Sequence, residues 1–191
     1  MHRRPEALLA GRGGARELLR VPALLFGAGV SLRNALYDRG ILRATRLPVP
    51  VVCVGNLTAG GTGKTPMVAC IVRALAQRGL RPGVLSRGYR SGSGAGDEAR
   101  LLARVLTDVP HVEDPDRVAG GRRLIERGVD AIVLDDGFQH RRLARDLDLV
   151  LVDATRPFGL EALDGTRPLE ALLPRGLLRE RPEALRRAHA C

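Results

Sequence analysis

Residues 51–65 read VVCVGNLTAGGTGKT, an aliphatic run followed by a glycine-rich loop and a Lys-Thr pair. The aliphatic run predicts a short buried strand. The residues after Thr65 predict a helix, because Met67, Ile71 and Leu75 recur at every fourth position. A strand, a glycine-rich loop and a helix that opens with Lys-Thr form the context of a phosphate-binding P-loop. The stretch therefore predicts a fold that binds nucleotides.

The loop itself supplies the expected contacts to nucleotide phosphates. Its glycines allow backbone N–H groups to turn toward phosphate oxygens, and the start of the helix adds its positive dipole end. Lys64, the only lysine among the 31 basic residues, is expected to reach the β- and γ-phosphates. The predicted nucleotide-binding residues are Thr58, Ala59, Gly60, Gly61, Thr62, Gly63, Lys64 and Thr65. A chance glycine-rich turn is the competing interpretation.

The segments around this loop alternate between strand and helix patterns. Strands are expected at 49–54, 83–86, 109–112, 131–134 and 147–152, and helices at 65–78, 97–106 and 116–127, with a short final helix near 183–188. This order, with almost entirely apolar strands, predicts an α/β fold of the P-loop NTPase type, with a mostly parallel sheet and helices on both faces. We expect a basic N-terminal helical segment at 1–48 and a nucleotide-binding domain at 49–191.

The composition narrows the range of functions. The chain has 191 residues and a net charge of +10, and this positive charge favours phosphorylated substrates and anionic surfaces. Aromatic residues make up only 3% and Trp is absent, which argues against an aromatic platform for single-stranded nucleic acid. The three cysteines have no metal-ligand spacing, which argues for a reducing compartment and against a disulfide scaffold.

Residues 1–48 combine nine arginines with scattered leucines. We expect two short helices there, because Pro22, Gly27 and Gly29 interrupt a single long one. One interpretation is an amphipathic segment that docks on anionic lipid through its apolar side and its arginines. The other is a helix packed on the core with solvated arginines, and the pattern leaves both open.

Two carboxylates, Asp135 and Asp136, follow the apolar run at 131–134. Ligands of open α/β sheets bind at the carboxyl ends of strands, so one of the pair is expected to hold Mg²⁺ together with the hydroxyl of Thr65. If the strand continued, the two side chains would point to opposite sides. A solvated turn is the alternative. His140 follows closely, as either a functional group or a structural one.

Two further candidates lie beyond the strand expected at 83–86. Arg87 is expected either to clamp a phosphate during phosphoryl transfer or to be an ordinary solvated arginine. Asp97 opens the helix expected at 97–106. The residue pattern alone favours a helix-capping role for it, and a general base is the functional alternative.

Five segments together resemble the tetraacyldisaccharide 4'-kinase family, the lipid A kinases of Gram-negative bacteria. They are GNLTAGGTGKTP at 55–66, SRGY at 86–89, GDE at 96–98, DDGFQHR at 135–141, and LLPRG at 172–176 with LRE at 178–180. Thr58 is the residue that this family has in place of the first P-loop glycine.

The resemblance implies transfer of the ATP γ-phosphate to the 4'-hydroxyl of a tetraacyldisaccharide 1-phosphate, with Mg²⁺, at the cytoplasmic face of the inner membrane. The lipid A precursor and the anionic inner-membrane surface would be the partners, and the enzyme would be peripheral, docked through residues 1–48. The resemblance also implies Asp97 as the general base and Asp135, Asp136 and Glu180 at the metal site. Together with the roles expected from the residues above, the predicted catalytic residues are Asp97, Lys64 and Arg87, and the predicted metal-site residues are Thr65, Asp135, Asp136 and Glu180.

The chain departs from the family pattern in two respects. Ala99 stands where the family usually has proline, and the chain is shorter than family members, so that a second, smaller domain is expected to be absent. The sequence is then a fragment, or a separate chain supplies the remaining half.

Three other classes of protein are alternatives to this family. Ala59 occupies the place of the signature lysine of partitioning-type ATPases, which counts against that class. A GTPase would need an Asn-Lys-x-Asp motif, which a chain with lysine only at position 64 does not contain. A nucleotide-binding remnant that docks on membranes without kinase activity remains open.

Overall fold

The computed structural model describes residues 9, 13–60, 62–88, 106–160 and 169–191. The chain divides into two compact units, and each is described by itself. Unit 1 comprises residues 1–42, 56–62 and 151–186, and unit 2 comprises residues 43–55, 63–150 and 187–191.

Unit 2 is built on a five-stranded sheet in the order β3-β2-β4-β1-β5. The strands are β1 Val51–Asn56, β2 Pro82–Ser86, β3 His111–Glu113, β4 Ala131–Asp135 and β5 Leu147–Leu151. The pairs β1/β4, β2/β4 and β2/β3 are all parallel. The expectation of a mostly parallel sheet is therefore confirmed, and the observed strands lie within about two residues of the expected ones.

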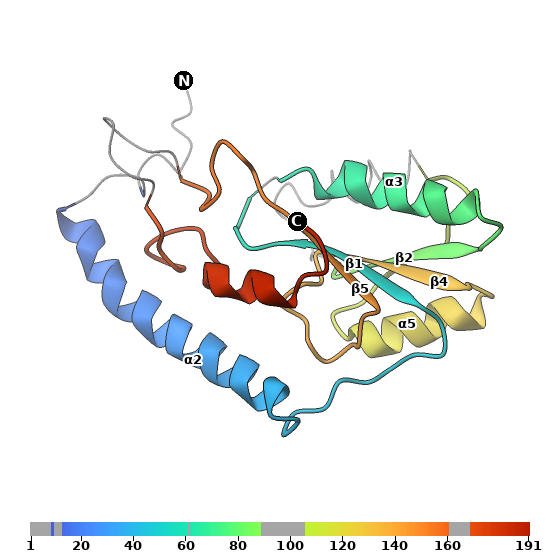
Figure 1. The fold of residues 1–191 in the computed structure, drawn as a ribbon, viewed down its shortest axis with the longest axis horizontal. Helices are drawn as coiled ribbons and strands as arrows, with labels where there is room; N and C mark the ends of the chain where they lie inside the picture. The colour runs from blue at the N-terminus through green and yellow to red at the C-terminus, as the bar shows by residue number, and fades with distance from the viewer. Residues whose placement is uncertain (1–8, 10–12, 61, 89–105, 161–168) are drawn as a thin grey trace. The chain divides into compact units, whose positions relative to one another are not determined.

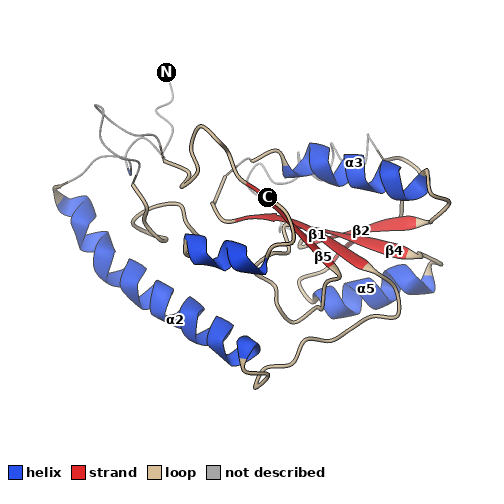
Figure 2. Cartoon of the chain, viewed as in Figure 1, coloured by secondary structure: helices blue, strands red, loops and turns tan. Residues whose placement is uncertain are grey.

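Helices α3 (Lys64–Ala76) and α5 (Arg117–Glu126) cover opposite faces of this sheet, as Figures 1 and 2 show. Asp116 caps α5 by accepting hydrogen bonds from the N–H groups of Val118 and Ala119. Gly120 lets α5 approach closely, because a Cβ there would lie 2.6 Å from Cδ1 of Leu85. The prediction of helices on both faces is confirmed.

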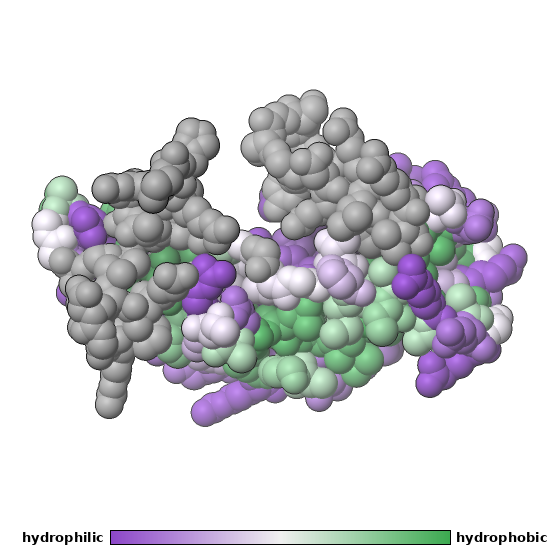
Figure 3. Space-filling view, turned by 90° about the horizontal axis from the view of Figure 1, so that it is seen from above, coloured by the Kyte–Doolittle hydropathy of each residue, from purple (hydrophilic) through white to green (hydrophobic). Residues whose placement is uncertain are grey.

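The core of unit 2 is aliphatic, as the composition requires. Buried side chains come from β1, β2 and β4 and from the inner faces of the helices, and they include Val51, Cys53, Val54, Val68, Val72, Val84, Leu85, Leu124, Ile132, Val133 and Leu134. Burial raises the pKa of the Cys53 thiol, so this cysteine is a neutral core residue. The space-filling view in Figure 3 shows hydrophobic side chains that reach the surface, with hydrophilic ones beside them.

Unit 1 holds a long N-terminal helix. A short 3-10 helix, η1 (Ala15–Leu19), leads directly into α2 (Arg20–Asp38), so the expectation of two short helices was wrong. Pro22 lies in the first turn of α2, where a backbone N–H has no partner within the helix and its loss is tolerated. Gly27 is buried. It packs against Leu172 so closely that a Cβ there would lie 2.5 Å from Cδ1 of Leu172.

The described residues after β5 are mostly irregular. The helix expected near 183–188 is a 3-10 helix, η2 (Pro182–Arg187). The helix expected at 97–106 lies almost wholly outside the described residues. Among the described residues, none of the helices has both the length and the hydropathy that a membrane span requires.

Candidate functional site

The start of α3 has the geometry of an anion site. Gly63 precedes the helix in the left-handed conformation, with φ 77°, which a glycine adopts without strain. Lys64 and Thr65 are the first two residues of the helix. Because glycine has no side chain to cap the helix, the N–H groups of the first turn are left to an anionic ligand. The helix thus begins at the pair of residues that the sequence predicted.

The end of β4 brings the paired carboxylates to the same place. Asp135 is the last residue of the strand and is registered with Val54 of the neighbouring β1. The N–H of Asp136 donates to the carbonyl of Val54 at 2.9 Å, and the backbone turns there with φ 52°. Nζ of Lys64 lies 3.8 Å from Oδ1 of Asp136, and both side chains are largely buried. Unit 2 therefore places a lysine and a carboxylate together beside the helix start.

The strand does not continue through both acids, so the condition for opposite orientations is not met. The left-handed conformation at Asp136 is uncommon for a residue other than glycine, and such outliers concentrate at functional sites. The chain turns directly after Asp135, which gives the two neighbouring carboxylates different surroundings.

Buried contacts that the sequence did not predict fix the turn after Asp136. The guanidinium of Arg145 donates to the carbonyl of His140 at 3.0 Å and forms a buried ion pair with Asp148. The side chain of Phe138 is fully buried, and the guanidinium carbon of Arg187 lies 4.7 Å from its ring centroid. These contacts hold the residues after the acids in one conformation. In a chain with so many arginines, the composition gives no signal that distinguishes Arg145 and Arg187 from solvated ones.

His140 lies within the same turn. Burial, and then the positive charge of Arg117, lower the pKa of its imidazole below the usual value. The side chain is therefore neutral at physiological pH. Both the functional and the structural interpretation of His140 stay open, since a neutral imidazole serves either.

Unit 1 contains the first half of the loop, from Asn56 to Thr62. The Asn56 side chain is fully buried, and its Nδ2 donates to Oγ1 of Thr62 at 3.0 Å, bracing the loop from within. Thr58 is buried and forms an antiparallel bridge with Leu178. The N–H of Ala59 donates to the carbonyl of Leu177 at 2.7 Å. Sequence reasoning missed Asn56, although a polar amide at the end of an apolar strand was the signal for it.

The remaining predicted residues are only partly accounted for. Arg87 is exposed directly after β2, where the hydroxyl of Ser86 is 2.8 Å from Nε2 of His111. Glu180 is buried, and its Oε2 accepts a hydrogen bond from Asn34 at 2.7 Å. Gly61 and Asp97 lie outside the described residues. The part of the chain that the structure describes holds no group of three or more His, Cys, Asp or Glu able to bind a metal.

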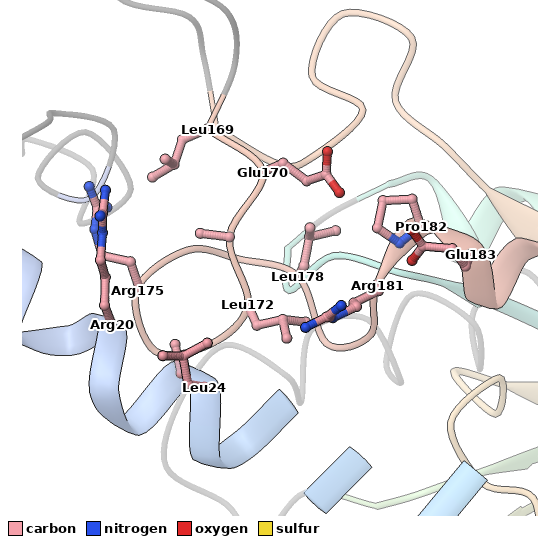
Figure 4. A pocket seen from close by; sticks show the side chains of 12 residues that line it. Arg20, Leu24, Leu169, Glu170, Leu172, Arg175, Leu178, Arg181, Pro182 and Glu183 are labelled. Carbon is pink, nitrogen blue, oxygen red and sulfur yellow. The ribbon is translucent and has the colours of Figure 1, made fainter. Parts of the chain in front are cut away.

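Unit 1 also contains a cavity of about 500 Å³ beside the first turns of α2. Figure 4 shows its lining, in which leucines alternate with the charged groups of Arg20, Arg175 and Arg181. Arg175 is buried and donates to Oε1 of Glu17 at 2.8 Å. This hydrogen bond lowers the pKa of Glu17 below its usual value. The cavity suits a ligand that has both apolar and polar parts.

Comparison with known proteins identifies the family. A family model described as tetraacyldisaccharide-1-P 4'-kinase matches residues 15–191. The chain belongs to this family. The tetraacyldisaccharide 4'-kinase of Syntrophus aciditrophicus is 48% identical over 90% of this chain, and that of Anaeromyxobacter dehalogenans strain 2CP-C is 47% identical over 97%.

A solved structure agrees with this assignment. LpxK from Aquifex aeolicus, crystallised in complex with ATP, is 37% identical to this chain and superposes with a TM-score of 0.77. The match covers 92% of this chain and 57% of that one. This chain spans about half the length of the two 4'-kinases named above, 49% and 50%. The P-loop NTPase-like fold and the 4'-kinase family that the sequence predicted are thus confirmed.

Proposed function

We propose that this chain is the nucleotide-binding part of an ATP-dependent kinase that phosphorylates the 4'-hydroxyl of a tetraacyldisaccharide 1-phosphate. The observation that carries the proposal is the meeting of Lys64, at the start of α3, with Asp136, at the end of β4, 3.8 Å apart. A lysine at a helix N-terminus next to a strand-end carboxylate is the arrangement that binds a nucleotide triphosphate with a divalent cation. Family membership supplies the acceptor.

The phosphates of ATP would be held by the loop at 58–65, with its backbone N–H groups and the ammonium of Lys64. Arg87 would add a second positive charge where negative charge develops during transfer. Asp97 would take the proton from the 4'-hydroxyl as its oxygen bonds to the γ-phosphorus and the bond to the β-phosphate oxygen breaks. In this arrangement Lys64 would bind the phosphates, Arg87 would stabilise the developing charge, and Asp97 would remove the proton.

The donor set near Lys64 fits Mg²⁺. The Thr65 hydroxyl and the carboxylates of Asp135 and Asp136 are hard oxygen ligands, and Mg²⁺ in kinases is commonly bound by one or two carboxylates plus substrate phosphates. A cluster of three acidic side chains is therefore unnecessary. When bound, the ion would neutralise charge on the phosphates. Glu180 is the fourth residue proposed for the metal site, and it rests on the family resemblance alone.

The N-terminal segment is proposed to dock on the cytoplasmic face of the inner membrane as a peripheral element. Large apolar side chains of η1 and α2 point into solvent, with Leu18 75%, Leu25 71% and Leu32 62% exposed. Arginines at 16, 20 and 33 lie along the same stretch. An exposed apolar surface with neighbouring cationic groups favours an anionic lipid surface.

Substitution of Lys64 tests the nucleotide site. We expect Lys64→Ala to weaken Mg·ATP binding by roughly 10- to 100-fold, because charge-assisted hydrogen bonds contribute about 1.5–3 kcal/mol. Arg78→Ala, which removes an exposed charge two residues beyond the other end of the same helix, should leave the affinity unchanged. Isothermal titration calorimetry gives both values. Equal affinities for the Lys64→Ala variant and the parent would contradict the assignment.

A phosphotransfer assay then separates a kinase from a nucleotide-binding remnant. The assay uses a lipid A precursor, with and without the rest of the family's length supplied as a separate chain. Transfer in either condition supports the kinase, while nucleotide binding without transfer in both supports the remnant.

A further inference from the structure

A series of buried contacts inside unit 1 runs from α2 to the first half of the phosphate loop. At the loop end, the N–H of Arg179 donates to the carbonyl of Leu57 at 2.7 Å, and the N–H of Ala59 donates to the carbonyl of Leu177 at 2.7 Å. Thr58 and Leu178 lie between these two bonds and are both buried. The loop at 57–59 is therefore paired, as one strand with another, to residues 177–179.

The next residue along the chain joins this strand pair to α2. Glu180 is only 1% exposed, and its Oε2 accepts a 2.7 Å hydrogen bond from Nδ2 of Asn34. Its Oε1 lies 3.8 Å from Nη2 of Arg33. A carboxylate buried to this degree needs such partners, because removing one leaves a charge that is poorly solvated.

A second contact holds α2 on the same segment of the chain. Gly27 faces Leu172 so closely that a Cβ would lie 2.5 Å from its Cδ1. Leu172 in turn forms a bridge with Leu178. Helix α2 is therefore attached to residues 172–180 at two points, Gly27 and Asn34, which are two helical turns apart. The residues that pair with the loop, 177–179, lie between the two attached residues Leu172 and Glu180 in sequence.

We infer that Glu180 is a positioning residue for the phosphate loop, held in place by Asn34, and that it links the docking of α2 on an anionic lipid surface to nucleotide binding. The inference rests on the proposed function. Docking restricts the motion of α2, which restricts Glu180 and the strand pair that carries Leu57 and Ala59. A loop that is already ordered loses less entropy when it binds phosphate, so the affinity for nucleotide rises. By linkage, nucleotide must raise the affinity for the lipid surface by the same factor.

The experiment measures the Kd for Mg·ATP in buffer and with vesicles of equal parts phosphatidylethanolamine and phosphatidylglycerol. For the parent chain we expect vesicles to tighten binding roughly fivefold, at the low end of coupling between sites. Asn34→Ala should abolish this gain while keeping α2 helical, since alanine has the highest helix propensity. Ser31→Ala, an exposed change on the same helix, should keep the gain, and Asn34→Gln, which retains the amide donor, should restore much of it.

The possible results separate this inference from its alternatives. A vesicle-dependent gain that survives in the Asn34→Ala variant, or that is missing in the parent, overturns the inference. If Glu180→Gln shifts the Mg²⁺ dependence of ATP binding while the Asn34→Ala variant keeps its gain, Glu180 acts at the metal and not through α2. If the parent binds no Mg·ATP in either condition, the proposed function fails and the inference falls with it. A change in thermal stability alone moves none of these ratios.

Discussion

Helices α2 and α3 both carry many aliphatic residues, yet they use them in opposite ways. Helix α3 buries Val68, Ala69 and Val72, and it covers one face of the sheet. Helix α2 buries only Ala23 and Gly27 and leaves Leu25 71% exposed. An apolar pattern therefore indicates that a helix surface will be covered, but it does not indicate whether protein or lipid covers it. For α3 the cover is the sheet of the same unit, and for α2 we propose that it is lipid.

The same glycine-to-alanine change in the two regions should produce the largest difference. We expect Gly55→Ala to destabilise the fold by about 3 kcal/mol, because a Cβ on this residue of β1 would lie 2.5 Å from Cβ of Phe138. Gly29→Ala on α2 meets no atom within 4 Å, and it should stabilise the chain by roughly 0.5–1 kcal/mol. Urea unfolding curves give both values. Similar shifts for the two variants would show that α2 is packed as closely as the sheet.

Truncation of one side chain on each helix sharpens the comparison. We expect Val72→Ala to lower the free energy of unfolding by about 2 kcal/mol, because its side chain is buried against the sheet. Leu25→Ala should change it by less than about 0.5 kcal/mol in buffer. The order should reverse on anionic vesicles, where Leu25→Ala weakens binding by up to roughly tenfold and Val72→Ala leaves it unchanged.

Vesicle co-sedimentation at rising salt completes this test. Salt screens only the contribution of the charges to vesicle binding. Vesicle binding that weakens with salt in both the Leu25→Ala and the Val72→Ala variants therefore indicates that arginines contribute to docking alongside the leucines. Equal vesicle affinity of the Leu25→Ala variant and the parent would mean that the exposed face of α2 is not the docking surface.

The sequence predicted the sheet and the site more fully than it predicted α2. Almost entirely apolar strands and the GGTGKT loop between a strand and a helix are strong local signals, and β1, α3 and β4 are found where expected. The interruption at Pro22 and Gly27 was misread, because proline is tolerated in a first helical turn. The helix glycine also has a packing role that only the contact with Leu172 reveals.

The supporting residues of the site could not be predicted for a related reason. Asn56 and Arg145 act through partners 6 or fewer positions away along the chain, but only the folded turns bring those groups within hydrogen-bond reach. Asn34 and Glu180 are 146 positions apart, and no local pattern indicates that pairing. Sequence periodicity reports which faces are buried, whereas specific polar pairs depend on the geometry of the whole fold.

The smallest expected effect on stability concerns the carboxylate of Asp146, which lies beside the first residue of β1. The N–H of Val51, the first residue of β1, donates to Oδ2 of Asp146 at 2.8 Å. This bond, and then the nearby guanidinium of Arg46, lower the pKa of Asp146 below its ordinary value of 3.8. A lowered carboxylate pKa adds stability at pH values above the unfolded pKa, and that stability is lost as the pH falls through the folded pKa.

We therefore expect Asp146→Asn to reduce the free energy of unfolding at about pH 7 by less than about 1 kcal/mol, because the carboxylate is partly exposed and screened by solvent. The difference from the parent should shrink as the pH falls below the ordinary value of 3.8 and through the lowered pKa of Asp146 in the folded chain. Unfolding midpoints measured across this range check the sign. A difference that stays constant with pH would show that the hydrogen bond to Val51, and not the charge, anchors this edge of the sheet.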